Sequence, residues 1–399
     1  MGERHMRRRT RTMAAAWAFA AAGWAGGLFA GRLDAQEQPA ASPAAVAPAP
    51  AVSVAAPAAK PRRILFVGNS FTHAHYSPAR LYNTAAVTDE NHGLPPDSPR
   101  ANKRAADNPP FSGVAGVFKK LTDEAGLPYE VHLEVISGKT LEYHYKHALP
   151  VIAQPGWDAV VLQGYSTESL PEVRSGKAGD QPRTEAGPVA TATPAPEAGT
   201  SPAPTTEPTP TPVPAEDPRI PSKQESFLRH TVLLEQAIHG ASPDAKVYLY
   251  ATWPCANNVY PERAMYAGES IDAMGADLHD GYGRAAAEDG HCAGVAPVGD
   301  AWLRAIHEGV ARENPYKDGP EDRLDLWGAD RKHPSGAGAY LAALVIFQQI
   351  TGHDARALGR DEEAAAALKI SPENAVRLQQ VAFDQVTSSA AQAAAAVVK

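Results

Sequence analysis

Residues 64–72 read ILFVGNSFT. The four apolar residues at the start are too few for a helix and predict a β-strand that is buried on both faces. Gly68 predicts a sharp turn that a side chain would obstruct, and Ser70 then lies just past the C-terminal end of the strand. Ligands bind at that edge of open parallel sheets. Ser70 is therefore a candidate nucleophile, although small polar residues after a strand also make ordinary turns.

Four further segments have the pattern of strands, and segments with helical periodicity lie between them. The predicted strands after the first are 129–136, 157–163, 246–253 and 295–299. The predicted helices are 77–87, 111–125, 139–149, 222–240, 266–288, 300–310, 335–352 and 371–386.

This alternation of strands and helices predicts a parallel sheet that is covered by helices on both faces. We expect a three-layer α/β/α fold of the flavodoxin-like type, with five strands in the order 2-1-3-4-5. Pro297 cannot donate a hydrogen bond to a neighbouring strand, so the fifth strand is expected at an edge.

The N-terminus has the pattern of an export signal over residues 1–35. A basic segment at 7–11 precedes an apolar, alanine-rich segment at 13–30, and small-residue cleavage sites follow at Ala30 and at 33–35. We therefore expect a bacterial protein that is exported to the periplasm or the extracellular space. An uncleaved N-terminal membrane anchor is the alternative.

Composition predicts two segments without a core. Residues 36–61 are mostly Ala, Pro and Val and predict a disordered tether, and residues 173–221 are a Pro- and Thr-rich insertion with almost no large apolar side chain. The folded domain is therefore predicted over 62–387, with a frayed tail at 388–399. The insertion is either tolerated passively or forms a flexible cover over the site, because it leaves from the same edge as Ser70.

The charge of the chain argues against some partners. The 399 residues contain 37 basic and 45 acidic residues, and without the first 35 residues these counts become 31 and 43. An acidic mature chain offers no patch for nucleic acid or for anionic membrane surfaces. Only two cysteines occur, Cys255 and Cys292, and they fall at opposite ends of predicted neighbouring strands, so two free thiols are expected.

Asp330 and His333 are separated by two residues and precede a predicted helix. On a tight turn, side chains at positions i and i+3 lie together. An acid beside an imidazole can hold its Nδ1–H and leave Nε2 outward as a base. The pair predicts a general base and its orienting acid, although a surface Asp and His before a helix is the ordinary alternative.

Ser70, Gly138 and Gln163 each lie at the C-terminal end of one of the first three strands, which the predicted order makes neighbours. A serine needs a base to become a nucleophile, and an acyl intermediate needs donors that point at its oxyanion. Together with Asp330 and His333, these residues therefore form one candidate site.

The set resembles the SGNH (GDSL-like) hydrolases, whose four blocks carry Ser, Gly, Asn and an Asp-x-x-His pair in this order. The resemblance covers residues 62–352 without the insertion, and residues 68–72, GNSFT, look like a variant of the Gly-Asp-Ser block. It implies that Ser70 is the nucleophile, His333 the base and Asp330 its orienting acid. The backbone N–H groups of Ser70 and Gly138 would be oxyanion donors.

The third block departs from the family pattern of Gly-x-Asn-Asp. Here the sequence is QGYST from Gln163. Either the Gln163 amide or the Ser166 hydroxyl, which stands at the Asn position, would supply the third oxyanion donor. Some carbohydrate-esterase-like branches of the family begin this block with Gln-Gly, so Gln163 is preferred.

The remaining site predictions concern the substrate pocket. Asn69, His73, Tyr165 and Trp253 lie next to the nucleophile or near strand ends and are candidates for it. No paired-cysteine or His-Glu-x-x-His spacing occurs, and His73, His75, His144 and His147 are not grouped as metal ligands usually are, so no metal and no cofactor is predicted.

These observations predict an exported serine esterase that works through an acyl-enzyme. The resemblance and the compartment suggest removal of an acetyl or other short acyl group from a carbohydrate or similar ester. Two alternatives remain, an O-acyltransferase with the same triad and a non-catalytic carbohydrate-binding or scaffold module.

Overall fold

The computed structural model describes residues 60–102, 109–172 and 222–397. The predicted signal segment, the predicted insertion and all of the predicted tether except Lys60 and Pro61 lie outside the described residues. Within the three described ranges, no helix is both long enough and apolar enough to cross a membrane.

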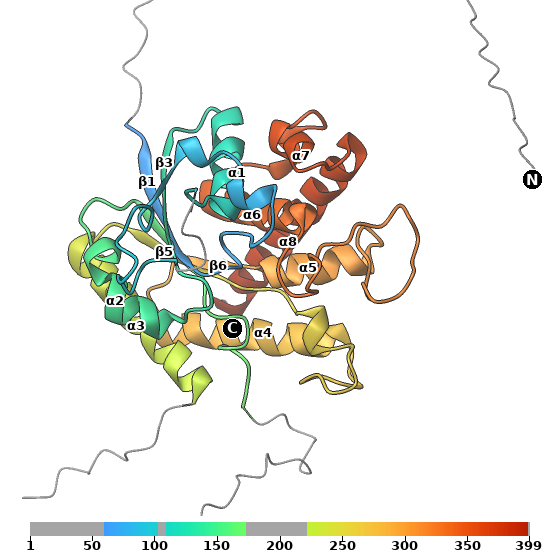
Figure 1. The fold of residues 1–399 in the computed structure, drawn as a ribbon, viewed down its shortest axis with the longest axis horizontal. Helices are drawn as coiled ribbons and strands as arrows, with labels where there is room; N and C mark the ends of the chain where they lie inside the picture. The colour runs from blue at the N-terminus through green and yellow to red at the C-terminus, as the bar shows by residue number, and fades with distance from the viewer. Residues whose placement is uncertain (1–59, 103–108, 173–221, 398–399) are drawn as a thin grey trace, which may run out of the picture. The chain divides into compact units, whose positions relative to one another are not determined.

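The described residues contain one parallel sheet with helices on both of its faces (Figure 1). Its strands are β1 (Arg62–Gly68), β2 (Val87–Asp89), β3 (Tyr129–Val135), β4 (Ala159–Leu162), β5 (Lys246–Tyr250) and β6 (Gly294–Ala296). Their spatial order is β2-β3-β1-β4-β5-β6. The five predicted strands and their order are thus confirmed as β3-β1-β4-β5-β6, and β6 lies at an edge as predicted. The predicted bounds 295–299 are wrong, since Pro297 follows β6 as the N-cap of the next helix.

The sixth strand corrects the prediction of a helix over 77–87. Two short 3₁₀ turns, Ala79–Leu81 and Thr84–Ala86, occupy that segment, and β2 follows them. Asn83 separates the turns with a backbone φ of +59°, a left-handed conformation that no α-helix contains. Three residues of β2 then pair with β3, from Val87 opposite Val131 to Asp89 opposite Leu133.

Strand β1 is buried on both faces, as its apolar run predicts. Ile64 and Phe66 belong to one core cluster, while Leu65 and Val67 belong to the other, because successive side chains of a strand point to opposite faces. Helices α2 (Leu141–Ile152) and α3 (Lys223–Ala241) cover the Leu65 face. The other face is covered mainly by α1 (Gly113–Glu124), α5 (Val298–His307) and α6 (Gly336–Thr351).

Three helices complete the described part of the fold: α4 (Ile271–Asp289), α7 (Glu363–Ala367) and α8 (Pro372–Val397). The predicted start at Asp300 of the helix over 300–310 is wrong, since α5 begins at Val298 and Asp300 lies in its first turn. Ser222 and Ser335, where two of the helices are predicted to begin, are the N-caps of α3 and α6, and Ser222 forms a full capping box with Glu225.

The prediction of a frayed tail after residue 387 is wrong for the described residues. Helix α8 continues to Val397, because the alanine-rich sequence there has high helix propensity and contains neither Gly nor Pro. Arg304 of α5 donates a hydrogen bond to Ser388 Oγ at 3.1 Å, which ties this part of α8 to the domain.

Both cysteines are free, as predicted. Strands β5 and β6 are parallel neighbours. Cys255 follows the C-terminal end of β5 and Cys292 precedes the N-terminal end of β6, so the two cysteines lie at opposite ends of the strands.

The register of the sheet aligns the C-terminal ends of β1, β3 and β4, where the candidate site residues follow. Gly68, at the end of β1, lies opposite Val135 of β3, and Val67 lies opposite Leu162 of β4. The turns after these three strands carry Ser70, Gly138 and Gln163, so all three residues follow the same edge of the sheet.

Candidate active site

The structure brings Ser70, His333 and Asp330 into one hydrogen-bonded chain. The Ser70 Oγ and His333 Nε2 atoms are 2.7 Å apart, and His333 Nδ1 lies 2.5 Å from Asp330 Oδ2. Because a carboxylate only accepts hydrogen bonds, Nδ1 carries the proton and Nε2 is left to accept the proton of the serine hydroxyl.

Asp330 is fixed by backbone as well as by the histidine ring. Its Oδ1 atom accepts hydrogen bonds from the N–H groups of Lys332 at 3.1 Å and of His333 at 3.0 Å. Oδ1 of Asp330 therefore fixes the backbone of the turn, and Oδ2 fixes the imidazole ring of His333. The segment before α6 thus places His333 next to Ser70, although the two residues are 263 positions apart in the sequence.

The electrostatics of the pair suit a general base. Burial lowers the pKa of His333 below its ordinary value, and although Asp330 opposes this shift, the electrostatic effects of His75 and Lys332 add to it. Burial would raise the pKa of Asp330, but the hydrogen bonds from the ring and backbone of His333 outweigh burial and lower it. At neutral pH the acid is therefore ionised and the imidazole is neutral.

Two backbone N–H groups are available as oxyanion donors. Among the described residues, neither the N–H of Ser70 nor that of Gly138 donates to a protein acceptor. The turn that carries Gly138 is tied to the nucleophile turn on both sides, because His73 Nε2 lies 2.9 Å from Ser137 Oγ and Asn69 Nδ2 donates to Lys139 O at 3.0 Å. The two turns that carry these N–H groups are therefore held together, as a pair of oxyanion donors needs.

The preference for Gln163 as the third oxyanion donor is not supported by its geometry. Its Oε1 atom accepts hydrogen bonds from Asn69 N at 3.0 Å and from Thr72 Oγ1 at 2.9 Å. The backbone N–H can only donate, so the oxygen of the amide must face the nucleophile turn. The amide nitrogen donates to Gly164 O. Gln163 therefore holds the turn in place, and a Cβ on Gly68 would lie only 2.6 Å from its Oε1.

Gln163→Ala is expected to lower stability and kcat together. The change leaves the N–H of Asn69 and the hydroxyl of Thr72 without an acceptor, which costs about 2 kcal/mol of unfolding free energy, and we expect kcat to fall about tenfold. Urea unfolding and ester turnover measure the two effects.

Ser166→Ala is the matched comparison, because the Ser166 hydroxyl is buried and has no hydrogen-bond partner in the described part of the chain. If this hydroxyl is the third donor, kcat falls by about a hundredfold or more without loss of stability. A fall of that size for Gln163→Ala, at unchanged stability, would contradict the positioning role of Gln163.

Three of the four predicted pocket residues are buried instead of lining a pocket. Trp253 is fully buried, stacks on Phe71 with ring centroids 4.5 Å apart, and donates its Nε1–H to Lys332 O. Asn69 is buried, and its Nδ2 donates to Lys139 O, which ties the turn after β1 to the turn after β3. His73 is buried as well, and burial lowers its pKa to about 3. Tyr165 is only half-buried and lies beside Lys332 Nζ, which is 4.9 Å from the centre of its ring.

Sequence reasoning missed Glu168, a buried carboxyl group beside the site. It is 2% exposed, and its Oε2 accepts a hydrogen bond from the N–H of Tyr165 at 2.7 Å. Burial raises its pKa to about 7. A lone Glu in a polar turn carries no sequence signal of such a role.

Glu168 is expected to make stability depend on pH. Its pKa is raised from 4.5 to about 7 in the folded chain, so the unfolded chain loses this proton first as pH rises. The contribution of Glu168 to stability therefore falls between about pH 4.5 and pH 7. We expect Glu168→Gln to remove this loss, so that the wild type loses more unfolding free energy than the variant between pH 5 and pH 8 in urea titrations. Equal losses in the two proteins would contradict the assignment.

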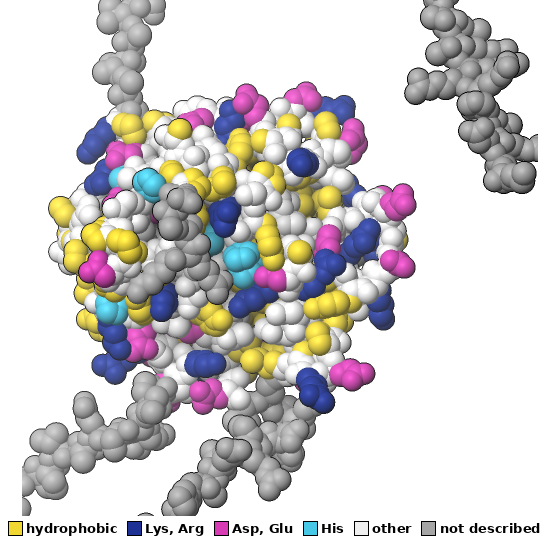
Figure 2. Space-filling view, in the orientation of Figure 1, with side chains coloured by type: hydrophobic (Ala, Val, Ile, Leu, Met, Phe, Trp, Pro, Cys, Tyr) yellow, Lys and Arg dark blue, Asp and Glu magenta, His cyan; other side chains and the backbone are white. Residues whose placement is uncertain are grey.

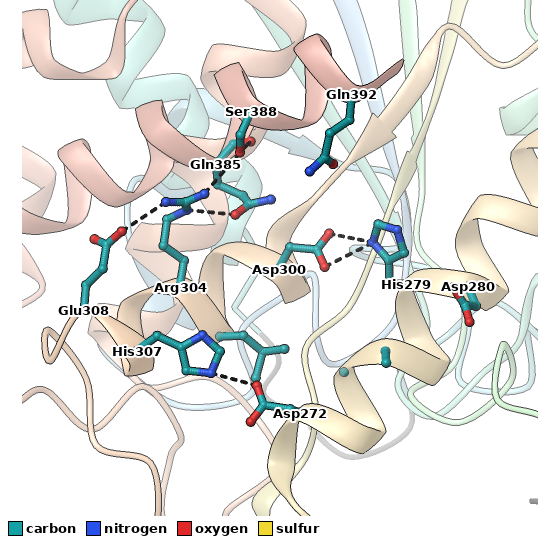
Figure 3. Close-up of a pocket in the computed structure, with 13 residues that line it drawn as sticks. Asp272, His279, Asp280, Asp300, Arg304, His307, Glu308, Gln385, Ser388 and Gln392 are labelled. Atoms are coloured by element: carbon teal, nitrogen blue, oxygen red, sulfur yellow. Dashed lines mark hydrogen bonds and ion pairs between the residues drawn. The ribbon is translucent and has the colours of Figure 1, made fainter. Parts of the chain in front are cut away.

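A surface pocket with a volume of 640 Å³ lies away from this site, between α4, α5 and α8 (Figure 3). Its two histidines are paired with carboxylates, His279 with Asp300 and His307 with Asp272. None of the three triad residues lines it. On the face drawn in Figure 2, acidic and basic side chains are interspersed with apolar ones.

No protein-family model matches the chain. A search of curated proteins finds no match either.

Solved structures are similar to the chain over most of its length. A protein of Slackia heliotrinireducens described as an SGNH hydrolase is 21% identical, with 73% of this chain and 100% of that chain covered and a TM-score of 0.39. A DUF4886 family protein of Bacteroides uniformis is 14% identical, with coverage of 82% and 95% and a TM-score of 0.45. An acetylxylan esterase of Geobacillus stearothermophilus is 14% identical, with coverage of 72% and 94% and a TM-score of 0.38.

The identities and TM-scores are too low to carry an argument about activity, which therefore rests on the residues of this chain.

Proposed function

We propose that the protein is an exported serine esterase that hydrolyses an ester through an acyl-enzyme. The observation that carries this proposal is the hydrogen-bonded chain from Ser70 Oγ through His333 to Asp330, next to two N–H groups that have no protein acceptor. A binding or scaffold module would have no use for a serine, an oriented base and oxyanion donors at one place.

In the first step of the proposed mechanism, His333 Nε2 takes the proton of Ser70 as Oγ attacks the ester carbonyl. The N–H groups of Ser70 and Gly138 stabilise the oxyanion. His333 then gives the proton to the leaving alcohol. In the second half, water attacks the acyl-enzyme with His333 again as base, which releases the acid and restores Ser70.

We place the substrate among short-chain acyl esters, with acetyl on a carbohydrate or similar alcohol as the main candidate. The support is the family resemblance of the sequence blocks and the predicted export. The triad is also reachable from solvent, since the side chains of His333 and Asp330 are 12% and 34% exposed. A bulky alcohol can therefore remain outside while its acyl group reaches Ser70.

Turnover and covalent labelling of the full chain test the proposal. We expect p-nitrophenyl acetate to be hydrolysed faster than longer-chain esters, and a fluorophosphonate to add once, on Ser70, as read by peptide mass spectrometry. The matched control is His333→Ala, which keeps the serine but removes its base and should lose the adduct. A wild type with no turnover and no adduct would overturn the esterase assignment.

The same assay separates hydrolysis from acyl transfer, because both pass through one acyl-enzyme. Release of free acetate that is unchanged by added xylose or glycerol supports hydrolysis. If most of the acetyl group appears on the added alcohol, the protein is an O-acyltransferase instead.

A further inference from the structure

A second group of polar side chains lies at the N-terminal ends of the strands, whereas Ser70 follows the C-terminal end of β1. Asp289 is the last residue of α4, His291 follows in the turn that leads to β6, and Glu235 projects from α3. One potential ligand atom from each of these three residues lies within 4.8 Å of the other two. Sequence spacing does not indicate this group, because Glu235 on α3 precedes Asp289 by 54 residues.

Both carboxylates are buried and leave an oxygen atom without a hydrogen bond. Asp289 is 7% exposed, and its Oδ2 accepts from the N–H groups of His291 at 3.0 Å and Cys292 at 2.7 Å. Its Oδ1 is buried and accepts none. Glu235 is 2% exposed, and its Oε1 also accepts no hydrogen bond, although it is in close contact with His239 Nδ1. Two buried carboxylates that face one space repel each other unless a cation lies between them.

His291 has the orientation of a metal ligand. Its Nδ1 donates to the carbonyl of Asp289 at 3.0 Å. A carbonyl only accepts, so in a neutral ring Nε2 of His291 carries a lone pair. Metal-binding histidines are typically held in this way, by a backbone carbonyl on the nitrogen that does not bind the metal.

We propose that Glu235, Asp289 and His291 bind a divalent transition-metal ion of the zinc class. Two carboxylates neutralise a 2+ ion, and imidazole nitrogen favours zinc over magnesium or calcium, which prefer oxygen ligands. Atoms bound to one zinc at about 2.1 Å are at most about 4.2 Å apart, so the three ligand atoms need to close only slightly. His291 is exposed and lies in a turn, so it can make this movement.

The ion would have a structural role at this place. It would link α3 to the turn between α4 and β6, at the edge of the sheet that does not carry the triad. The site is independent of the proposed esterase activity.

The experiment uses the untagged full chain, freed of metal with a chelator, and zinc ions alone as the probe. We expect equilibrium dialysis to give one zinc ion per chain and calorimetry to show a rise in Tm of roughly 5 °C at saturating zinc. Magnesium and calcium should leave Tm unchanged. His291→Ala should weaken zinc binding at least tenfold and remove most of the rise in Tm.

The control variant is His279→Ala. His279 is also exposed and paired with a carboxylate, Asp300, in the pocket of Figure 3, so it reports adventitious zinc binding at a surface histidine. Retained zinc binding in His279→Ala together with loss in His291→Ala supports the site. The proposal is overturned if the wild type binds no zinc, if His291→Ala binds it as tightly as the wild type, or if both variants lose it equally. A Glu235→Gln variant adds a second test from α3 and should also lose affinity at least tenfold.

Discussion

The Asp330→Asn variant is expected to lose about 10⁴-fold in kcat on p-nitrophenyl acetate while its stability changes little. In the wild type, Asp330 Oδ1 accepts two backbone N–H groups, and Oδ2 accepts the Nδ1–H of His333. An asparagine keeps its oxygen toward the backbone donors and turns its NH₂ group toward the ring. The proton of His333 then moves to Nε2, which faces Ser70 Oγ as a donor and can no longer accept the hydroxyl proton.

Asp354→Asn is a suitable control, because it makes the same chemical change on an exposed aspartate that pairs with Arg356. It should retain wild-type kcat. If Asp330→Asn stays within tenfold of the wild type, the carboxylate does not set the tautomer of His333, and the proposed triad is contradicted.

Gly113→Ala is expected to cost about 3 kcal/mol of unfolding free energy. Gly113 has a φ of +57°, and a Cβ on it would lie 2.4 Å from backbone atoms of Thr72 and His73. The cost combines left-handed backbone strain with a clash against backbone, which cannot move aside as a flexible side chain can. Calorimetry should show a Tm lower by roughly 5–10 °C.

The same variant should also lower kcat, because the clash falls two residues after the nucleophile. The N–H of Val114 donates to Thr72 O at 2.9 Å, so the start of α1 is fixed directly against this turn. Gly126→Ala is the matched control, since Gly126 has a φ of +68° but no atom within 4 Å of an added Cβ. It should cost about 1 kcal/mol and leave kcat unchanged. Equal losses in both variants would show that the backbone angle alone matters.

The main course of the fold could be predicted because buried strands and amphipathic helices leave clear local patterns. The run at 64–67 has side chains in both core clusters, and no other element type explains four successive buried residues as simply. Strand β2 could not be predicted, because its three residues are strand only through pairing with β3. The predicted fraying after residue 387 is wrong for the described end of α8, because alanine has high helix propensity.

The candidate site also contains residues that could be predicted from the sequence and residues whose roles could not. Ser70, Gly138, Asp330 and His333 could be proposed from the sequence, because each lies in a turn at the end of a strand or before a helix, and their chemistry is recognisable at short range. The part played by Gln163 depends on which of its amide atoms faces the N–H of Asn69. Trp253 is a candidate for the substrate pocket by its position near a strand end, but it stacks between Phe71 and Trp302. Burial of this kind is set by helices far away in the sequence.

By itself, the sequence determined five of the six strands along the chain, the turn with Ser70 and the acid–base pair of Asp330 and His333. Strand patterns, turn glycines and i, i+3 pairs are local properties of a chain. Only the tertiary structure decided that His333 lies within 2.7 Å of Ser70, that Gln163 holds the turn after β1, and that Glu168 and the group around Asp289 are buried. These facts depend on contacts between distant segments, and hydrogen-bond direction and burial arise only when those segments pack together.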